Sequence, residues 1–304
     1  MNYLDNYPLL GQFRGKLKGG FMTEGIVEQI DLLHSRYGDE YAILAERILA
    51  MLVKMGYDTV FICQQYIYDY LTQLRKFLKT GEYRQESFEQ IKESIYDNAD
   101  MMLETYMPGL FLAYGSTTIL YSKYNLFRNK FLPLLNVGSV GVEVGFGEGF
   151  YLWELFSNAP ALKFDGYDIS EHAITFATKL FGHAGIPEDN YRLALGDITQ
   201  GIDVHGNAYD FGIIAEVIEH IQDPKKCVQE IARIIKTGGY LYLSTVKDSN
   251  HMDHITNFKS TEDVEGILRN CGFDVLDKSI YRIQDDFPKT KDISIGLSYV
   301  CRKV

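Results

Sequence analysis

The first third of the chain carries hydrophobic residues at the spacing of amphipathic helices. Between residues 21 and 106, four series of apolar side chains return every three or four positions, which places each series on one face of a helix. The first series consists of Ile26, Ile30, Leu33 and Tyr37. Glycines such as Gly38 and Gly56 separate the series. The pattern predicts a helical segment that packs against the rest of the chain, takes part in dimerisation, or both.

From residue 141 onward, short apolar runs alternate with helix signals. The runs that predict strands cover residues 141–144, 161–168, 191–195, 210–215 and 240–246. Ser170 and Pro224 mark the beginnings of two helices, and Gly238–Gly239 is expected to end the second. Polar residues follow the strands, and ligands of open α/β sheets bind at the carboxyl ends of strands. We therefore expect a ligand site at that edge.

The last part of the chain predicts one helix and two strands. Ser260 and Asp263 have the spacing of a capping box before a helix that begins at about Thr261. Residues 273–281 and 294–300 follow as strands. The alternation of helices and strands indicates the α/β class.

Three glycines at alternate positions, Gly145, Gly147 and Gly149, follow the first apolar run. Glycines in a turn after a strand let the backbone approach a bound ligand closely. A dinucleotide fingerprint would require glycine where this chain has Phe150. Glu143 would repel a pyrophosphate, whereas it suits a cofactor that carries an ammonium group. The stretch therefore favours a cationic, nucleotide-type cofactor.

Downstream motifs stand in the order and spacing of a known family. Asp168 lies roughly twenty residues beyond the glycines, the usual distance for a carboxylate that holds ribose hydroxyls. Residues 196–198 read Gly-Asp-Ile, residues 216–224 read E-V-I-E-H-I-Q-D-P, and residues 236–239 read Lys-Thr-Gly-Gly. With the glycine stretch, the chain from about residue 137 to residue 304 resembles a class I S-adenosylmethionine-dependent methyltransferase.

The resemblance implies an α/β fold with a Rossmann-like class I methyltransferase sheet. That sheet is mostly parallel with a C-terminal antiparallel hairpin, and an α-helical N-terminal domain precedes it. We expect residues 1–130 to form a helical cap, lid or dimerisation domain. Residues 131–304 are expected to form the cofactor-binding methyltransferase domain.

The resemblance also implies S-adenosylmethionine as cofactor and assigns residues to it. Glu143 would hold the amino end of its methionine part, and Asp168 would take the ribose hydroxyls. Asp197 and Ile198 would bracket adenine. The remaining expected contacts are Gly145, Phe146, Gly147 and Gly149 in the glycine turn, Ile169 after the acid, and Glu216 and Val217 near the sulfonium.

The acceptor side has weaker signals. Tyr114 and Tyr121 lie shortly before the first strand, and tyrosine suits a binding wall because it is apolar with a polar tip. His220 and His254 are candidate general bases for an oxygen nucleophile. The two tyrosines equally suit an interface between helices. We predict all four as candidate catalytic residues.

A metal is an alternative for part of this set. His251, Asp253 and His254 could be ligands, but this spacing in a loop is weak evidence. The four cysteines are scattered and form no C-x-x-C pair. We therefore assign no metal. The alternative to a metal site is that Asp253 interacts with His254 and stabilises the loop.

Composition and charge limit the partners. The 304 residues carry a net charge of −11 and contain no long basic run, which disfavours nucleic acid and anionic membranes as partners. No apolar run approaches the length of a membrane span, and the N-terminus lacks a basic secretory signal, so we expect a cytoplasmic protein. A homodimer through the N-terminal helices is possible.

Three functions are compatible with these patterns. The fourth strand is followed by Ala215–Ile218 and not by the [D/N]-P-P-[Y/F] box of amino-group methylases of DNA and glutamine, which favours a small-molecule acceptor. The leading prediction is a small-molecule methyltransferase of specialised biosynthesis. The alternatives are an enzyme that cyclises the methionine part of the cofactor and releases methylthioadenosine, and a non-catalytic scaffold that binds the cofactor.

Overall fold

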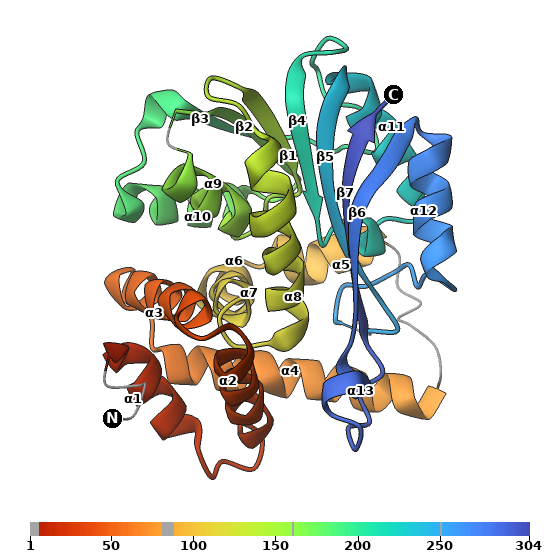
Figure 1. Cartoon of the computed structure of the whole chain (residues 1–304). Coiled ribbons are helices and arrows are strands. Elements are labelled where there is room, and N and C mark those ends of the chain that lie inside the picture. The colour runs from red at the N-terminus through yellow and green to blue at the C-terminus, as the bar shows by residue number, and fades with distance from the viewer. Residues whose placement is uncertain (1–5, 81–87, 160, 250) are drawn as a thin grey trace.

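The computed structural model describes residues 6–80, 88–159, 161–249 and 251–304. Its centre is a seven-stranded sheet in the order β3-β2-β1-β4-β5-β7-β6 (Figure 1). The parallel strands are β1 (Val140–Val144), β2 (Lys163–Asp168), β3 (Tyr191–Leu195), β4 (Tyr209–Ala215) and β5 (Ile235–Lys247). β6 (Phe273–Arg282) and β7 (Ile295–Lys303) are antiparallel to their neighbours, with β7 between β5 and β6. The predicted fold class is confirmed.

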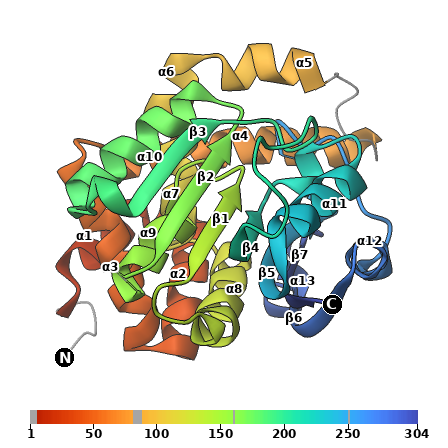
Figure 2. The ribbon, with the colours of Figure 1, turned by 90° about the horizontal axis from the view of Figure 1, so that it is seen from above.

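Helices cover both faces of this sheet, and alternate residues of each strand supply the two cores. Figure 2 shows α9 (Phe150–Asn158) and α10 (Glu171–Ala184) on one side, and α11 (Pro224–Ile234) and α12 (Thr261–Asn270) on the other. Within β5, Tyr242 joins the hydrophobic cluster of the first side, whereas its neighbours Leu241 and Leu243 join that of the second. The strands are therefore buried on both faces, as parallel strands usually are.

The N-terminal segment forms four long helices and a series of shorter ones. The long helices are α1 (Pro8–Leu17), α2 (Glu24–Tyr37), α3 (Asp39–Lys54) and α4 (Thr59–Thr80). The shorter helical segments are α5 (Phe88–Ile91), η2 (Lys92–Tyr96), α6 (Ala99–Met101), η3 (Met102–Tyr106), α7 (Met107–Ala113), α8 (Thr118–Leu126), η4 (Phe127–Phe131) and η5 (Leu132–Leu134). The helical character that periodicity predicts for residues 21–106 is confirmed over the described residues.

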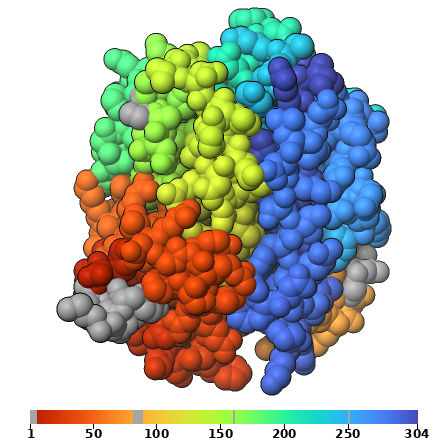
Figure 3. All heavy atoms as spheres, viewed as in Figure 1, coloured from red at the N-terminus to blue at the C-terminus, as the bar shows by residue number. Residues whose placement is uncertain are grey.

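One hydrophobic cluster runs through the N-terminal helices and the sheet. It includes Leu10 of α1, Ile48 of α3 and Phe111 of α7, and it continues through Phe176 of α10 to Tyr242 of β5. In the space-filling view, the red and orange helices lie directly against the yellow-green α8 and the blue C-terminal strands (Figure 3). The helices thus share a core with the sheet.

Helix α1 was not predicted by the periodicity. Its ten residues include two glycines, which are weak helix formers, and only Leu10, Phe13 and Leu17 are buried. A distant side chain completes the helix: the Glu46 carboxylate accepts hydrogen bonds from the backbone N–H groups of Leu9 and Leu10 at 3.0 and 2.8 Å. Because Glu46 belongs to α3, this helix depends on tertiary structure.

The prediction that Gly238–Gly239 ends a helix is wrong. Helix α11 ends at Ile234, and both glycines lie within β5. Gly239 lies where the register between β4 and β5 shifts, and an added Cβ atom there would lie 2.6 Å from the Asp210 carbonyl oxygen. The glycine therefore permits a close approach of two backbones inside the sheet.

Two further elements complete the molecule. The capping box before α12 is confirmed, since the Asp263 carboxylate accepts a hydrogen bond from the Ser260 N–H at 2.9 Å. A short helix, α13 (Ile283–Asp286), connects β6 to the loop that leads into β7. Within the described part of the chain, no helix combines the length and the apolar character required to cross a membrane.

Candidate active site

A cavity of about 760 Å³ lies between the carboxyl ends of the parallel strands and the N-terminal helices. Its sheet side is formed by residues that follow β1, β2, β3 and β4, and its helix side by α4, η2, η3, α7 and α8. The predicted site residues that line it are Glu143, Gly145, Phe146, Gly147, Asp168, Ile169, Asp197, Ile198, Glu216, Val217, Tyr114, His220 and His254. Residues far apart in the sequence thus meet at the predicted edge of the sheet.

The glycine turn at the end of β1 requires backbone conformations that favour glycine. Gly145 has a φ angle of 66°, and a Cβ atom there would lie 2.5 Å from Cγ2 of Val217. The Gly147 N–H donates to Oδ2 of Asp168 at 2.9 Å, and the Ser170 N–H donates to Oδ1 of the same carboxylate at 2.9 Å. Asp168 therefore ties the turn to the end of β2.

Gly149 is the third glycine of the motif. It begins α9 with a φ angle of 74° and is absent from the described residues that line the cavity. A Cβ atom at this position would lie 3.2 Å from both Ala177 and Phe181 of α10. Its lack of a side chain accommodates the neighbouring helix α10.

Two buried carboxyls lie beside the turn. Oε2 of Glu143 is buried and has no hydrogen-bond partner among the described residues. Burial and the charges of Glu148 and Asp168 raise the pKa of Glu143 well above its usual range. Burial also raises the pKa of Glu148 to about 8, with Glu216 and Asp168 adding to the effect. This arrangement would be stabilised by a cationic ligand.

Glu148 was not assigned a role from the sequence, although it stands between two glycines of the motif. Lys123 was also missed. It is 1% exposed, lies on α8, and forms an ion pair with the Glu216 carboxylate, whose other oxygen accepts from the Ser244 hydroxyl at 2.7 Å. The available signal was a single charged residue within the apolar stretch 118–126. Glu216 itself has a φ angle of 56°, which is uncommon for a non-glycine residue.

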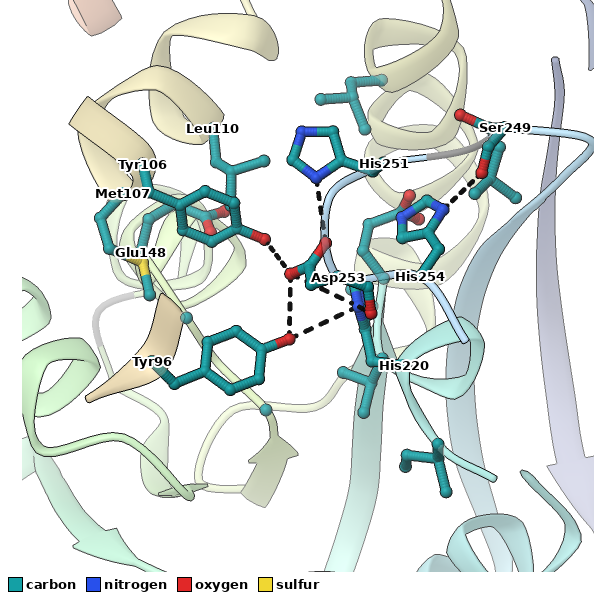
Figure 4. Close-up of a pocket in the computed structure, with 18 of the residues that line it drawn as sticks. Tyr96, Tyr106, Met107, Leu110, Glu148, His220, Ser249, His251, Asp253 and His254 are labelled. Atoms are coloured by element: carbon teal, nitrogen blue, oxygen red, sulfur yellow. Dashed lines mark hydrogen bonds and ion pairs between the residues drawn. The ribbon is translucent and has the colours of Figure 1, made fainter. Parts of the chain in front are cut away.

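At the other end of the cavity, several side chains converge on Asp253, in the loop between β5 and α12 (Figure 4). The hydroxyls of Tyr96 and Tyr106 both donate to its Oδ2, the former at 2.9 Å. Nδ1 of His251 lies 3.0 Å from Oδ1. Burial of Asp253 would raise its pKa, but His220 and His251 outweigh that effect and hold the pKa well below the usual range. The carboxylate is therefore ionised.

The two predicted histidines lie next to this cluster. Nδ1 of His220 is 3.1 Å from the Asp253 carbonyl oxygen, and Nδ1 of His254 is 2.5 Å from the Ser249 carbonyl oxygen. The two rings lie 4.8 Å apart between centroids. Burial lowers the pKa of His220, but Asp253 and Glu219 outweigh it and raise the pKa above the usual value. For His254, burial and the charge of His220 lower the pKa well below that value.

The two predicted tyrosines have different positions. Tyr114 lines the cavity, and its ring stacks on Phe150 with centroids 3.7 Å apart. Tyr121 is fully buried between helices, where its ring packs against Tyr37 and Tyr41 at 4.8 and 5.3 Å, and it is absent from the described lining of the cavity. Tyr121 therefore packs between helices in this structure, and of the two tyrosines Tyr114 lies at the cavity.

Sequence reasoning missed Tyr96, which occupies a position in a helical segment that predicted only packing. The hydroxyls of Tyr96 and Tyr106 reach a loop about 150 residues away. Nothing in the local pattern distinguishes Tyr96 from the other tyrosines of the helices. Asp253 and His254 were a usable signal. They lie in the loop that follows β5, and ligands of open α/β sheets bind at the carboxyl ends of the strands.

The fold and this site are those of the class I S-adenosylmethionine-dependent methyltransferase superfamily. Residues 135–286, half of the chain, match the methyltransferase domain family, and the chain belongs to that family. S-adenosylmethionine is accordingly its cofactor.

Sequence relatives share parts of this chain. It is 28% identical over 113 residues to the ubiquinone biosynthesis O-methyltransferase of Marinobacter nauticus, which covers 36% of this chain and 44% of that protein. It is 27% identical over 194 residues to the ribosomal protein L11 methyltransferase of Streptococcus pneumoniae, which covers 62% and 53% respectively. The chain thus spans about half the length of these curated relatives.

Solved structures share the fold. Phosphoethanolamine N-methyltransferase 2 of Haemonchus contortus in complex with S-adenosyl-L-methionine has a TM-score of 0.51 at 15% identity, over 72% of this chain and 60% of that chain. The (4+2)-cyclase SpnF has a TM-score of 0.50 at 17% identity, over 60% and 79%. At these identities the likeness concerns the fold alone.

The side chains that line the cavity fit this cofactor, as the charges near the glycine turn indicate. S-adenosylmethionine carries an ammonium and a sulfonium, and the glycine turn offers a buried carboxylate oxygen of Glu143 without a partner among the described residues. Four further acids, Glu148, Asp168, Asp197 and Glu216, line the same cavity. The ammonium and the sulfonium would compensate this negative charge.

Proposed function

We propose that this protein transfers the methyl group of S-adenosylmethionine to a small-molecule acceptor that lies beside Tyr96, Tyr106, His220 and Asp253. The observation that carries the proposal is that one cavity joins the glycine turn to this polar cluster. Its volume of about 760 Å³ leaves room for a small acceptor next to the cofactor. A cavity covered by helices on one side suits a small molecule better than a folded protein or a nucleic acid.

At the cofactor end, we assign the backbone of Gly145 and Gly147 to close approach at the methionine part. Glu143 faces the amino group, with Glu148 near it. Asp168 is assigned to the ribose hydroxyls; its two oxygens accept from the backbone N–H groups of Gly147 and Ser170, which fixes the carboxylate at the edge of the cavity. Asp197 and Ile198 lie after β3 and are assigned to adenine. These assignments follow the motif positions that line the cavity.

When bound, the cofactor supplies an electrophilic methyl group on a sulfonium. The protein's main task is then to place a nucleophilic atom of the acceptor in line with the methyl–sulfur bond, because orientation can lower a barrier by about 7–11 kcal/mol. Tyr96 and Tyr106, held by the ionised Asp253, form a fixed polar wall for that placement. Apolar side chains of α4 and α8 that line the cavity supply apolar contacts to the acceptor.

For an oxygen acceptor, His220 is the group positioned to take its proton. The imidazole of His220 would take the hydroxyl proton, while the cofactor would supply the methyl group and keep the electron pair of the methyl–sulfur bond on sulfur. The Asp253 carbonyl oxygen lies 3.1 Å from Nδ1 of His220 and favours a proton there, which leaves Nε2 as the basic nitrogen. His254 is less suited to this role, because its lowered pKa makes it a weaker base.

The test is product analysis. The purified protein is incubated with methyl-labelled S-adenosylmethionine and a library of small hydroxylated and amine acceptors, and products are identified by mass spectrometry. Label on an acceptor together with S-adenosylhomocysteine supports the proposal. Release of methylthioadenosine would identify the cyclising reaction, and saturable cofactor binding in calorimetry with no product from any acceptor would favour a scaffold.

A further inference from the structure

Three side chains converge at the acceptor end of the cavity, two of them buried and His220 half-buried. They are Glu219 and His220 at the end of the short helical turn η7 (Ile218–His220) and His254 in the loop after β5. One ligand atom from each lies within 4.8 Å of the other two. Two imidazoles and one carboxylate are a ligand set that first-row transition metals favour.

The Glu219 carboxylate has fewer hydrogen bonds than a buried carboxylate needs. Glu219 is 1% exposed, and its Oε2 accepts from the Thr245 hydroxyl at 2.7 Å. Its Oε1 is buried with no hydrogen-bond partner among the described residues. A buried carboxylate oxygen without a donor costs free energy, and a cation at that position would remove the cost.

The histidines have the surroundings of metal ligands. A ligating histidine donates its second ring N–H to a carbonyl or carboxylate, which fixes the ring and leaves the lone pair on the other nitrogen. Nδ1 of His220 faces the Asp253 carbonyl oxygen at 3.1 Å, and Nδ1 of His254 faces the Ser249 carbonyl oxygen at 2.5 Å. Both contacts favour the tautomer with a lone pair on Nε2.

We propose that Glu219, His220 and His254 bind one divalent first-row transition-metal ion. In a tetrahedral site with bonds of about 2.1 Å, ligand atoms lie about 3.4 Å apart, so the three side chains draw together by roughly 1 Å when the ion binds. Each is held by a fixed outer partner: Thr245, the Asp253 carbonyl and the Ser249 carbonyl. Mg²⁺ and Ca²⁺ are disfavoured because they prefer oxygen ligands.

An overlapping set, His251, Asp253 and His254, is a weaker candidate. The Asp253 carboxylate already accepts hydrogen bonds from Tyr96 and Tyr106 and faces Nδ1 of His251 (Figure 4). Both of its oxygens are therefore engaged, whereas Glu219 offers an oxygen without a partner in the described structure. The comparison favours the set that contains Glu219.

A role for this ion in methyl transfer rests on the proposed function. His220 and His254 line the acceptor end of the cavity, so an ion held by them and by Glu219 would lie beside the acceptor. An acceptor oxygen there would be polarised by the ion and would lose its proton to solvent more readily. His220 then serves as a ligand, and the ion replaces it in activating the acceptor, which favours acceptors with two neighbouring oxygen atoms.

The site is tested by binding, without any acceptor. Full-length protein is freed of metal with a chelator and titrated with Co²⁺, followed by calorimetry and by the visible absorption of the ion. We expect one saturable site per chain, which Glu219→Gln and His254→Gln abolish. Thr245→Val removes only the outer partner of Glu219 and should weaken binding by about 10–100-fold.

Two control variants separate the alternatives. His251→Gln should bind Co²⁺ like the unmodified chain, and so should His205→Gln, which removes an exposed histidine outside the cavity. The absence of a saturable site in the unmodified protein would overturn the proposal even if a variant fails to fold. So would undiminished binding by Glu219→Gln, or a loss in His251→Gln as large as in His254→Gln. Metal binding without methyl transfer to any acceptor would contradict the proposed function and leave the metal site standing.

Discussion

At the scale of single residues, Asp168 serves two purposes at once. Its carboxylate accepts the N–H groups of Gly147 and Ser170, which shapes the turn that receives the cofactor, and we also assign it to the ribose. Removing it would therefore remove a ligand contact and loosen the glycine turn. Both effects act on the affinity for the cofactor.

We predict that Asp168→Ala weakens the binding of S-adenosylhomocysteine by more than about tenfold, or about 1.4 kcal/mol. Isothermal titration calorimetry measures the dissociation constant directly. Asp165→Ala on the same strand is the matched control, because Asp165 bonds to Arg192 and Tyr209 outside the cavity. An unchanged dissociation constant for Asp168→Ala would contradict the ribose assignment.

The ion pair of Lys123 and Glu216 is a second residue-scale feature. Breaking a buried pair leaves an uncompensated charge, and Lys123 is almost fully buried. We predict that Lys123→Met lowers the free energy of unfolding by about 3 kcal/mol. In the double variant with Glu216→Gln, the loss should be smaller than the sum of the single losses.

Urea denaturation of the four proteins in this cycle measures the coupling. Additive losses would show that the two side chains do not interact in solution. The Ser244 hydroxyl also bonds to Glu216, so Ser244→Ala serves as a control that removes one partner of the carboxylate and leaves the lysine in place.

At the scale of elements, the periodicity of the sequence predicted most helices, and the exceptions have tertiary causes. Helix α1 lacks strong helix formers and gains its N-terminal hydrogen bonds from Glu46 of α3. Two successive glycines, such as Gly238 and Gly239, are typical of a helix end. Here both lie inside β5, which pairs with β4. Both differences arise because partners distant in sequence decide which local conformation is stable.

Glu46→Ala should therefore loosen α1 selectively. The two N–H groups at the beginning of the helix would lose their acceptor, and capping interactions of this kind contribute about 1 kcal/mol. Hydrogen–deuterium exchange with mass spectrometry should show faster exchange in residues 8–17 and little change in the sheet. Glu28→Ala, at an exposed position of α2, is the control; equal exchange of α1 in both variants would rule out the role of Glu46.

At the scale of the whole molecule, several buried carboxyl groups with raised pKa values lie in or next to the cavity. Burial and neighbouring acids raise the pKa of Glu148 to about 8 and that of Glu219 to about 7, and they raise that of Glu143 as well. In the unfolded chain these groups titrate near 4.5. The folded protein therefore binds protons that the unfolded chain has released.

The sign of the pH dependence follows from this difference. The contribution of Glu148 is fully present below about pH 4.5 and is lost as the pH rises to about 8, because the folded state then has to ionise a buried acid. The free energy of unfolding of the cofactor-free protein should fall between about pH 6 and pH 8. Glu148→Gln, which keeps an uncharged side chain, should reduce that fall.

Urea denaturation at a series of pH values provides the measurement. Glu28→Gln, an exposed glutamate on α2, should leave the pH dependence as it is in the unmodified protein. If Glu148→Gln and the unmodified protein lose stability in parallel over this range, the buried carboxyl of Glu148 is not the source of the effect.

The sequence by itself determined the features that depend on neighbouring residues. Alternation and helical spacing predicted the elements, and the ordered motifs from the glycine turn to residues 236–239 indicated the fold and the cofactor. These signals are local, because strand pleat, helix pitch and the conformational freedom of glycine act within a few positions of the chain.

Only the tertiary structure decided which side chains meet. Tyr114 and Tyr121 are similar candidates in the sequence, but the packing of α8 turns Tyr121 into the helical core, while Tyr114 reaches the cavity. Tyr96 and Asp253 bond across 157 residues, and no pattern at either position encodes the other. The acceptor end of the site is formed by contacts between distant segments, and such contacts are fixed by the packing of the whole chain around one core.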